Sequence, residues 1–168
     1  MSTLEDVELF LPRHLSEDQR ELLVSTLEKF PQNFYAHAYS AERLDTDEIL
    51  QGDGLVAAPV GFFPKPQIRD QLVMVLSNTC DVDPENKRIQ PSIMQYSPVL
   101  SAEGYEAKLK EEGVDDDRVR SHLAELKNQK ISNALFLPKG GRLEKDAVVF
   151  IDRTISISVE ELDLSKLA

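Results

Sequence analysis

A group of small polar residues follows directly on an apolar run near the middle of the chain. The apolar run covers residues 72–76. The polar residues after it are Ser77, Asn78, Thr79, Cys80 and Asp81. An aspartate can take a proton as a general base, and a cysteine thiolate can act as a nucleophile. Functional side chains often lie on loops held by a rigid scaffold, so this segment is the first candidate site.

Cys80 is the only cysteine of the chain, and a reactive thiolate needs a base beside it. None of the three histidines, His14, His37 and His122, is close to it in sequence. We therefore expect a buried and inert thiol, although the fold can still bring His37 near. The neighbouring polar side chains equally fit a turn in which they bond their own backbone.

Composition limits the classes of protein to which the chain can belong. It has 168 residues, a formal net charge of −11 and a 41% share of hydrophobic residues, enough for a core. An acidic chain binds nucleic acid only if its few cations gather in one groove, and otherwise suits a basic partner. One cysteine, no apolar leader and no long apolar stretch favour a cytoplasmic protein without a membrane partner.

Most of the predicted elements are short strands. β-branched and apolar runs predict strands at residues 55–63, 72–77, 88–99, 134–137, 147–151 and 154–158. The run at 72–77 is expected to be buried on both faces, and residues 64–69 to form a stiff loop before it.

Helices are predicted at both ends and in one insert. Ser16 and Gln19 have the spacing of a capping box ahead of an amphipathic helix that ends at Pro31. Residues 101–130 predict a helical insert and residues 159–167 a closing helix. The acidic run at 115–117 suits the N-terminal turn of a helix better than a cation site, so we expect no metal and no cofactor.

These elements predict a mainly β fold with helical additions, built as a small and strongly bent barrel. The expected organisation is a helical N-terminal extension, residues 1–50, packed on a barrel formed by residues 51–168.

The order of several residues is similar to that of a known family. Gly52 and Asp53 precede the first strand, Arg69 precedes the apolar run, and Ser97 ends a later strand. Near the end, residues 143–155 hold an acidic turn, a β-branched strand and a basic-hydroxyl pair. In these features the chain from residue 52 to 162, without the insert, resembles the MazF/PemK-type toxins, which are SH3-like barrels and mRNA endoribonucleases.

The resemblance implies a metal-independent RNase and assigns its groups. Arg69 would stabilise the phosphate, Ser97 would be a donor beside it, and Asp81 would be the base. The residues expected to bind RNA around them are Lys65, Lys87, Arg88, Asn78 and Thr79. The alternative for the two arginines is simple surface pairing with nearby carboxylates, which contributes little to stability.

A second function class stays open beside the RNase. The barrel would be catalytically silent and act as a protein-binding module, a role that the acidic charge favours. The partner would be an antitoxin or another protein with a basic surface. A homodimer is expected from the resemblance alone.

Overall fold

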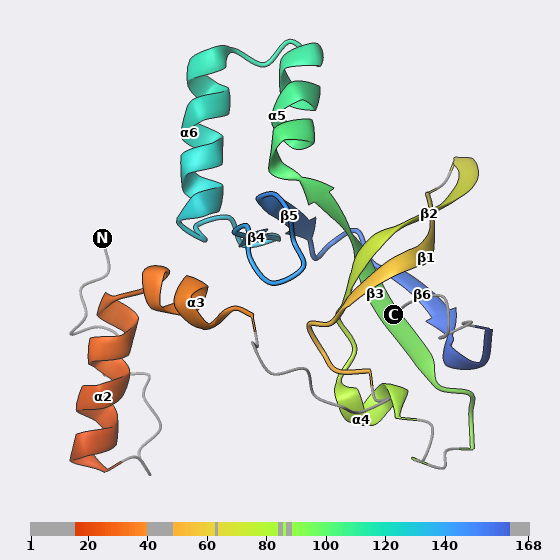
Figure 1. Ribbon diagram of the computed structural model, residues 1–168, viewed down its shortest axis with the longest axis horizontal. Helices are drawn as coiled ribbons and strands as arrows, with labels where there is room; N and C mark the ends of the chain where they lie inside the picture. The colour runs from red at the N-terminus through yellow and green to blue at the C-terminus, as the bar shows by residue number, and fades with distance from the viewer. Residues whose placement is uncertain (1–15, 40–48, 63, 84–85, 87–88, 162–168) are drawn as a thin grey trace. The chain divides into compact units, whose positions relative to one another are not determined.

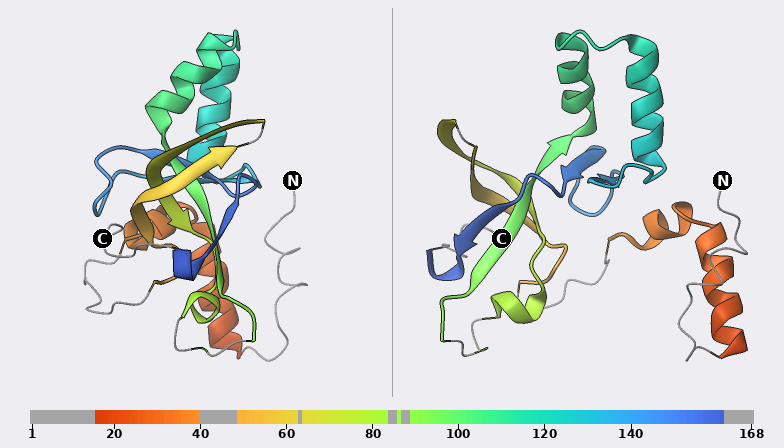
Figure 2. Two further views of the ribbon diagram at one scale, coloured as in Figure 1. Left: turned by 90° about the vertical axis from the view of Figure 1, so that its right-hand side faces the viewer. Right: turned by 180° about the vertical axis from the view of Figure 1, so that it is seen from behind.

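The computed structural model describes residues 16–39, 49–62, 64–83, 86 and 89–161, and the side chains of His37, Lys65 and Pro66 are not part of the description. The chain divides into two compact units, residues 1–40 and 41–168. Figures 1 and 2 show the elements of each unit. The unit boundary falls about ten residues before the one expected from the sequence.

The described residues of the first unit, 16–39, form two helices, α2 (Glu17–Glu28) and α3 (Gln32–His37). The predicted capping box is present, because the Ser16 side chain accepts from the Gln19 backbone and the Gln19 side chain accepts from the Ser16 backbone. The predicted N-terminal helix is therefore confirmed.

The second unit is built on one antiparallel sheet. Its strands are β1 (Gly54–Phe62), β2 (Lys65–Val75), β3 (Ile93–Ser101), β4 (Ala134–Leu137), β5 (Ala147–Phe150) and β6 (Ile155–Ser158). Their order is β1-β2-β3-β5-β4, and β6 also pairs with β3. The fold is thus mainly β with helical additions, as the sequence predicts.

Strand β3 is the centre of this sheet (Figure 1). One of its edges pairs with β2, where Met74 lies opposite Ser97. Its other edge is shared, because the first half pairs with β6 and the second half with β5. A strand with neighbours on both edges has its backbone groups paired on both sides.

The apolar run of the sequence forms the end of β2. Val73 and Val75 are fully buried, whereas Leu72 and Met74 are only half-buried. The predicted strand is confirmed, but burial on both faces is not, because an antiparallel strand alternates between a core face and an outer face. Residues 65–69 also belong to β2, so the expected loop is an extension of this strand.

The core of the sheet unit combines side chains of four elements with an aromatic anchor. Its buried members are Leu55, Ala58, Val60, Val73, Val75, Val82, Met94 and Tyr96. The ring of Tyr96 is fully buried, and its hydroxyl donates to the carbonyl of Pro59 at 2.6 Å. This bond ties β3 to β1 across the width of β2.

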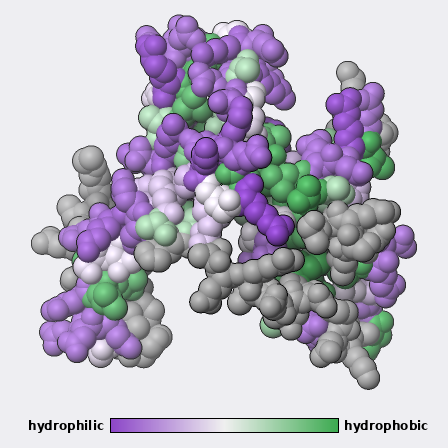
Figure 3. All heavy atoms as spheres, in the orientation of Figure 1, coloured by the Kyte–Doolittle hydropathy of each residue, from purple (hydrophilic) through white to green (hydrophobic). Residues whose placement is uncertain are grey.

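The predicted insert is a hairpin of two helices, α5 (Ala102–Glu111) and α6 (Asp116–Lys127), which lie side by side in Figures 1 and 2. Asp115 caps α6 by accepting from the backbone of Asp117 and Arg118, so part of the acidic run has the role predicted for it. Hydrophilic side chains cover most of the hairpin at the top of Figure 3.

Two short elements are also present among the described residues of the unit, α4 (Thr79–Val82) and the 3₁₀ helix η1 (Val159–Glu161). The rest of the predicted closing helix lies outside the described residues. Among the helices that the structure describes, none has both the length and the apolar character needed to cross a bilayer.

We expect Tyr96→Phe to lower the free energy of unfolding by about 1–3 kcal/mol, because the carbonyl of Pro59 loses a buried donor. Burial raises the pKa of Tyr96 above its ordinary value of 10.0, so the folded chain keeps this proton where the unfolded chain loses it. The greater stability of the wild-type protein over Tyr96→Phe is therefore fully present below pH 10 and is lost as the pH rises through the folded-state pKa of Tyr96. Urea unfolding of the wild-type protein and of Tyr96→Phe, at neutral pH and above pH 10, measures this difference in stability. Equal unfolding curves at neutral pH would show that the hydrogen bond from Tyr96 to Pro59 does not stabilise the fold.

Candidate functional site

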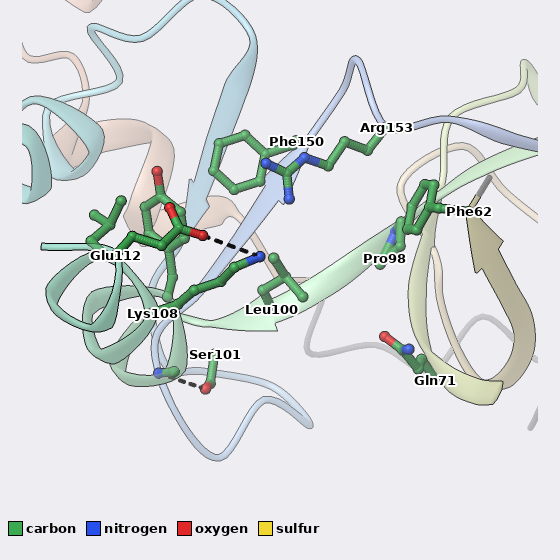
Figure 4. A pocket seen from close by; sticks show the side chains of 12 residues that line it. Phe62, Gln71, Pro98, Leu100, Ser101, Lys108, Glu112, Phe150 and Arg153 are labelled. Carbon is green, nitrogen blue, oxygen red and sulfur yellow. Dashed lines mark hydrogen bonds and ion pairs between the residues drawn. The ribbon is translucent and has the colours of Figure 1, made fainter. Parts of the chain in front are cut away.

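A cleft of about 580 Å³ lies between α5, the end of β5 and the β1–β2 hairpin. Its apolar floor is formed by Pro98 and Leu100 of β3 together with Phe150. Figure 4 shows the polar side chains of Lys108, Glu112, Arg153 and others around this floor. An apolar surface with a few convergent polar groups is typical of a ligand site. We refer to it below as the α5 cleft.

Arg153 is one of two cations in the α5 cleft. Its guanidinium carbon lies 4.4 Å from the centre of the Phe150 ring, so the cation is held over the aromatic face. The ring of Tyr105 meets the same phenyl ring edge-on at a centroid distance of 5.1 Å. These contacts give the arginine a fixed position while one side of its guanidinium faces the cleft (Figure 4).

The second cation is Lys108, which lies one helical turn before Glu112 on α5. Their charged atoms are 3.9 Å apart, and both side chains are more than half exposed. Such a pair contributes little to stability, so both groups can turn to a ligand at small cost.

The turn that carries Arg153 is fastened by a buried serine. Ser97 is fully buried, and its hydroxyl lies 2.7 Å from the carbonyl of Phe150 and 3.3 Å from that of Arg153. The backbone N–H of Arg153 donates to the same Phe150 carbonyl at 2.9 Å. From the other side, the amide of Asn133 donates to the Asp152 carboxylate at 2.8 Å. The turn is therefore tied both to the centre of the sheet and to the segment before β4.

Tyr105 and His122 connect the two helices of the insert next to the α5 cleft. The tyrosine hydroxyl and the imidazole Nε2 are 2.9 Å apart, within one hydrogen bond. Burial raises the pKa of Tyr105 above 10.0, Arg153 opposes this rise, and Glu112 adds to it. The tyrosine is thus a neutral donor or acceptor at physiological pH. His122 is half-buried because α5 packs beside it.

The opposite wall of the α5 cleft belongs to the β1–β2 hairpin. Phe62 at the end of β1 is 46% exposed, so its ring has a free face. Gln71 of β2 is half-buried, and its side chain lines the same space. In Figure 4 these two residues lie across the cleft from Lys108 and Glu112.

The polar segment that follows β2 borders a separate hollow. Asn78 and Asp81 line a space of about 510 Å³ together with Gln51 and Gln95. The Thr79 hydroxyl accepts from the backbone of Gln51 at 3.2 Å. The segment itself is a single helical turn, α4, and so forms local structure of its own.

Cys80 lies in this same helical turn. The sequence predicts a buried thiol, and this prediction is wrong, because Cys80 is exposed. The reason is that α4 begins only at Thr79, beyond the end of the buried strand, and of its residues only Val82 is buried.

The structure does not bring the three predicted catalytic residues together. Arg69 is exposed on β2, and its guanidinium donates to the Gln67 amide at 3.0 Å. Along β2 it precedes Met74, the partner of Ser97, by five residues, or roughly 16 Å at 3.3 Å per residue. Asp81 lies beyond the other end of this strand.

The predicted role of Ser97 as a phosphate donor receives no support from this geometry, because its hydroxyl is buried and directed at two backbone carbonyls. Of the predicted RNA-binding residues, Lys65 begins β2. Lys87 and Arg88 lie outside the described residues. Their roles, like that of Arg69, stay predictions.

Sequence reasoning missed the groups that line the α5 cleft. Lys108, Tyr105 and Glu112 look like ordinary residues of a charged helix, and Gln71 looks like a polar residue that merely precedes the apolar run. One signal was available, because the basic-hydroxyl pair near the end of the resemblance is Arg153 and Thr154.

Comparisons of the chain with protein-family models, with curated proteins and with solved structures found no match.

We expect Ser97→Ala to lower the free energy of unfolding by about 1 kcal/mol, because the Phe150 carbonyl loses the buried hydroxyl that ties it to β3 and keeps only the Arg153 N–H as donor. The matched control is Ser156→Ala on the exposed face of β6, for which we expect a change within about 0.5 kcal/mol. Urea unfolding measures both changes. Equal, small effects of the two substitutions would show that the buried serine does not fasten the turn.

Proposed function

We propose that the protein is a metal-independent endoribonuclease of the MazF/PemK type, and that single-stranded RNA lies in the α5 cleft. The observation that carries the proposal is the pairing of two cations, Lys108 and Arg153, with an apolar and aromatic floor in a chain of net charge −11. An acidic chain needs such a local concentration of positive charge to hold a phosphate backbone.

The contents of the α5 cleft match the chemistry of a single-stranded RNA. Unpaired bases stack on aromatic rings and on arginine planes, and lysine and arginine hold the phosphates. Phe62 and the face of the Arg153 guanidinium that is turned away from Phe150 supply such surfaces within the one cleft. The largest part of the binding energy is then expected from stacking and short-range ion pairs.

The cleavage step needs a base and a stabiliser of negative charge. Glu112 is the carboxylate of the α5 cleft and takes the proton of the 2′-hydroxyl. The 2′-oxygen then forms a bond to the adjacent phosphorus, and the bond from phosphorus to the 5′-oxygen breaks. Arg153 and Lys108 stabilise the charge on the phosphate oxygens, and the leaving 5′-oxygen takes a proton from water. The products are a 2′,3′-cyclic phosphate and a 5′-hydroxyl.

The fold assigned by this proposal is an SH3-like barrel. It is supported by the antiparallel order β1-β2-β3 and by the division of β3 between β6 and β5. A strand whose two halves pair with different partners is what a strongly bent sheet requires.

The proposal changes the residues expected to act. The resemblance gives the phosphate-stabilising role to Arg69, whereas the α5 cleft gives it to Arg153. Arg69 is not among the residues that line this cleft, and its guanidinium is bonded to the neighbouring Gln67. Substitution of each arginine separates the two assignments.

A protein-binding role is the second candidate, and the exposed apolar side chains of the β1–β2 hairpin favour it. Val56, Phe62 and Ile68 are 53%, 46% and 71% exposed. Phe62 and Ile68 lie toward the tip of this hairpin, where Ile68 is beside Gly61, and exposed apolar side chains close together on a surface are typical of an interaction site. The partner would be an antitoxin, another protein, or a second copy of the chain, and the barrel would then be catalytically silent.

We expect Arg153→Ala and Lys108→Ala each to reduce the rate of RNA cleavage by about a hundredfold, because each removes a cation that stabilises the transition state. The matched control is Arg118→Ala, which removes an exposed cation of α6 that does not line the cleft. Cleavage of a 5′-labelled single-stranded RNA in the presence of EDTA measures the rates, and circular dichroism checks the fold.

Three results would contradict the assignment. If Arg69→Ala abolishes cleavage while Arg153→Ala does not, the reaction does not take place in the α5 cleft. If Arg118→Ala has the same effect as Arg153→Ala, the loss reflects net charge alone. If the wild-type protein neither cleaves RNA nor slows growth when it is expressed, the enzyme is ruled out and the binding role is favoured.

A further inference from the structure

The second helix of the insert, α6, contributes no residue to the lining of the α5 cleft, but it contacts one that does. We propose that His122 and Tyr105 are positioning residues that act on the reaction through Arg153. Their hydrogen bond fixes the tyrosine ring, and this ring fixes the phenyl ring on which the guanidinium lies. The inference rests on the proposed function, in which Arg153 stabilises the charge on the phosphate.

His122 is held in place by the anchored face of α6. Val119 lies three residues before it and Leu126 four residues after it, and both side chains are fully buried. Residues three and four apart lie on the same face of a helix, so His122 belongs to the face of α6 that packs against the rest of the unit. The imidazole therefore gives α5 a partner whose position is set by buried packing.

The Tyr105 side chain connects this imidazole to the α5 cleft. Its hydroxyl oxygen lies 2.9 Å from the His122 Nε2, and the centres of the two rings are 5.8 Å apart. The bond can form in either protonation state of the imidazole, because a tyrosine hydroxyl both donates and accepts. Within the described part of the chain, this hydroxyl makes no other hydrogen bond. The bond thus favours one orientation of the Tyr105 ring over its other rotamers.

In this orientation the Tyr105 ring supports Phe150. The two rings meet edge to face, with 5.1 Å between their centres and an angle of 61° between their planes, a favourable arrangement for aromatic side chains. The Phe150 ring in turn lies 4.4 Å from the guanidinium carbon of Arg153. Burial raises the pKa of Tyr105 and the positive charge of Arg153 opposes this rise, as expected of close neighbours. A continuous series of contacts therefore runs from α6 to the guanidinium.

Arg153 depends on this support because its side chain is exposed. Among the residues that the structure describes, no carboxylate forms an ion pair with its guanidinium, and the ion pair drawn in Figure 4 joins Lys108 to Glu112. A long exposed side chain has many rotamers, and the aromatic support selects among them. A misplacement of about 1 Å can lower a catalytic rate about a hundredfold. Loss of the support is therefore expected to affect the chemical step more than RNA binding.

The position of Arg153 can be measured without RNA. An arginine over a phenyl face is shielded by the ring current, so its Nε–H and δ-methylene signals are displaced upfield in NMR spectra, and the loss of these signals in Arg153→Ala assigns them. We expect Tyr105→Phe and His122→Ala to move them toward the position of an exposed arginine. His122→Gln, whose amide can bond the hydroxyl, and Ser121→Ala, on the exposed face of α6, should leave them in place.

The same variants are assayed for cleavage of a 5′-labelled single-stranded RNA in EDTA. We expect Tyr105→Phe and His122→Ala each to lower kcat about tenfold and to leave KM within about twofold, because the cation is present but displaced. The double variant should match the single ones, because both changes remove one bond. In the Arg153→Ala background, Tyr105→Phe should have no further effect, because the group on which it acts is absent. Circular dichroism checks that each variant is folded.

The possible results separate this inference from the proposed function. A displaced Arg153 signal in variants of a protein that cleaves no RNA would support the role of the pair in placing the arginine and overturn the RNase. Cleavage that requires Arg153 but proceeds at the wild-type rate in Tyr105→Phe and His122→Ala would overturn the inference and leave the RNase in place. An effect of Tyr105→Phe that is equally large in the Arg153→Ala background would show that the tyrosine does not act through the arginine.

Discussion

The sharing of strand β3 among three neighbours is the constraint on which the sheet unit depends. One edge of β3 is occupied by β2, and the other is divided between β6 and β5. The division falls near Ser97, whose buried hydroxyl bonds the backbone after β5. A buried hydroxyl without partners is costly, so Ser97 and the turn from β5 to β6 stabilise each other.

The α5 cleft follows from this arrangement of β3. Helix α5 starts directly after β3, and Ser101 caps it by accepting from the backbone of Gly104 at 3.1 Å. A Cβ atom at Gly104 would lie 2.8 Å from the Ser101 hydroxyl, so a side chain there would disturb the cap. The cap fixes how the helix leaves the sheet, and with it where Lys108 and Glu112 lie over the floor. The positions of both cations thus depend on β3. Lys108 is positioned through the cap at Ser101, and Arg153 through the hydroxyl of Ser97.

Local structure in this chain was predictable because its signals are local. The capping box at Ser16 and the cap at Asp115 each rest on residues a few positions apart. The strands at residues 134–137 and 147–150 are marked by apolar runs. Such patterns depend on the backbone geometry of one element and need no knowledge of the rest of the fold.

The candidate site was harder to predict from the sequence, because it combines side chains from four separate stretches of the chain. Phe62, Gln71, Lys108 and Arg153 meet only after β3 has joined its neighbours. The direction of a strand side chain depends on register, which no short pattern reveals. The resemblance assigned Ser97 to the phosphate of the RNA, whereas the structure buries it with its hydroxyl directed at the backbone of Phe150 and Arg153.

Under the proposed function, the acidic charge of the chain limits the kind of contact that the α5 cleft can make with RNA. At physiological ionic strength the field of distant charges decays over about 8 Å, so remote carboxylates weaken the approach of RNA only moderately. Among the residues that line the cleft, the two cations outnumber the one carboxylate, Glu112, and the Phe150 ring holds the Arg153 guanidinium in position. With few phosphates neutralised, binding changes little with salt concentration. Under the proposed function, affinity comes mainly from stacking and short-range ion pairs, and because stacking accepts any base, any choice of RNA sequence would have to come from hydrogen bonds to the base edges.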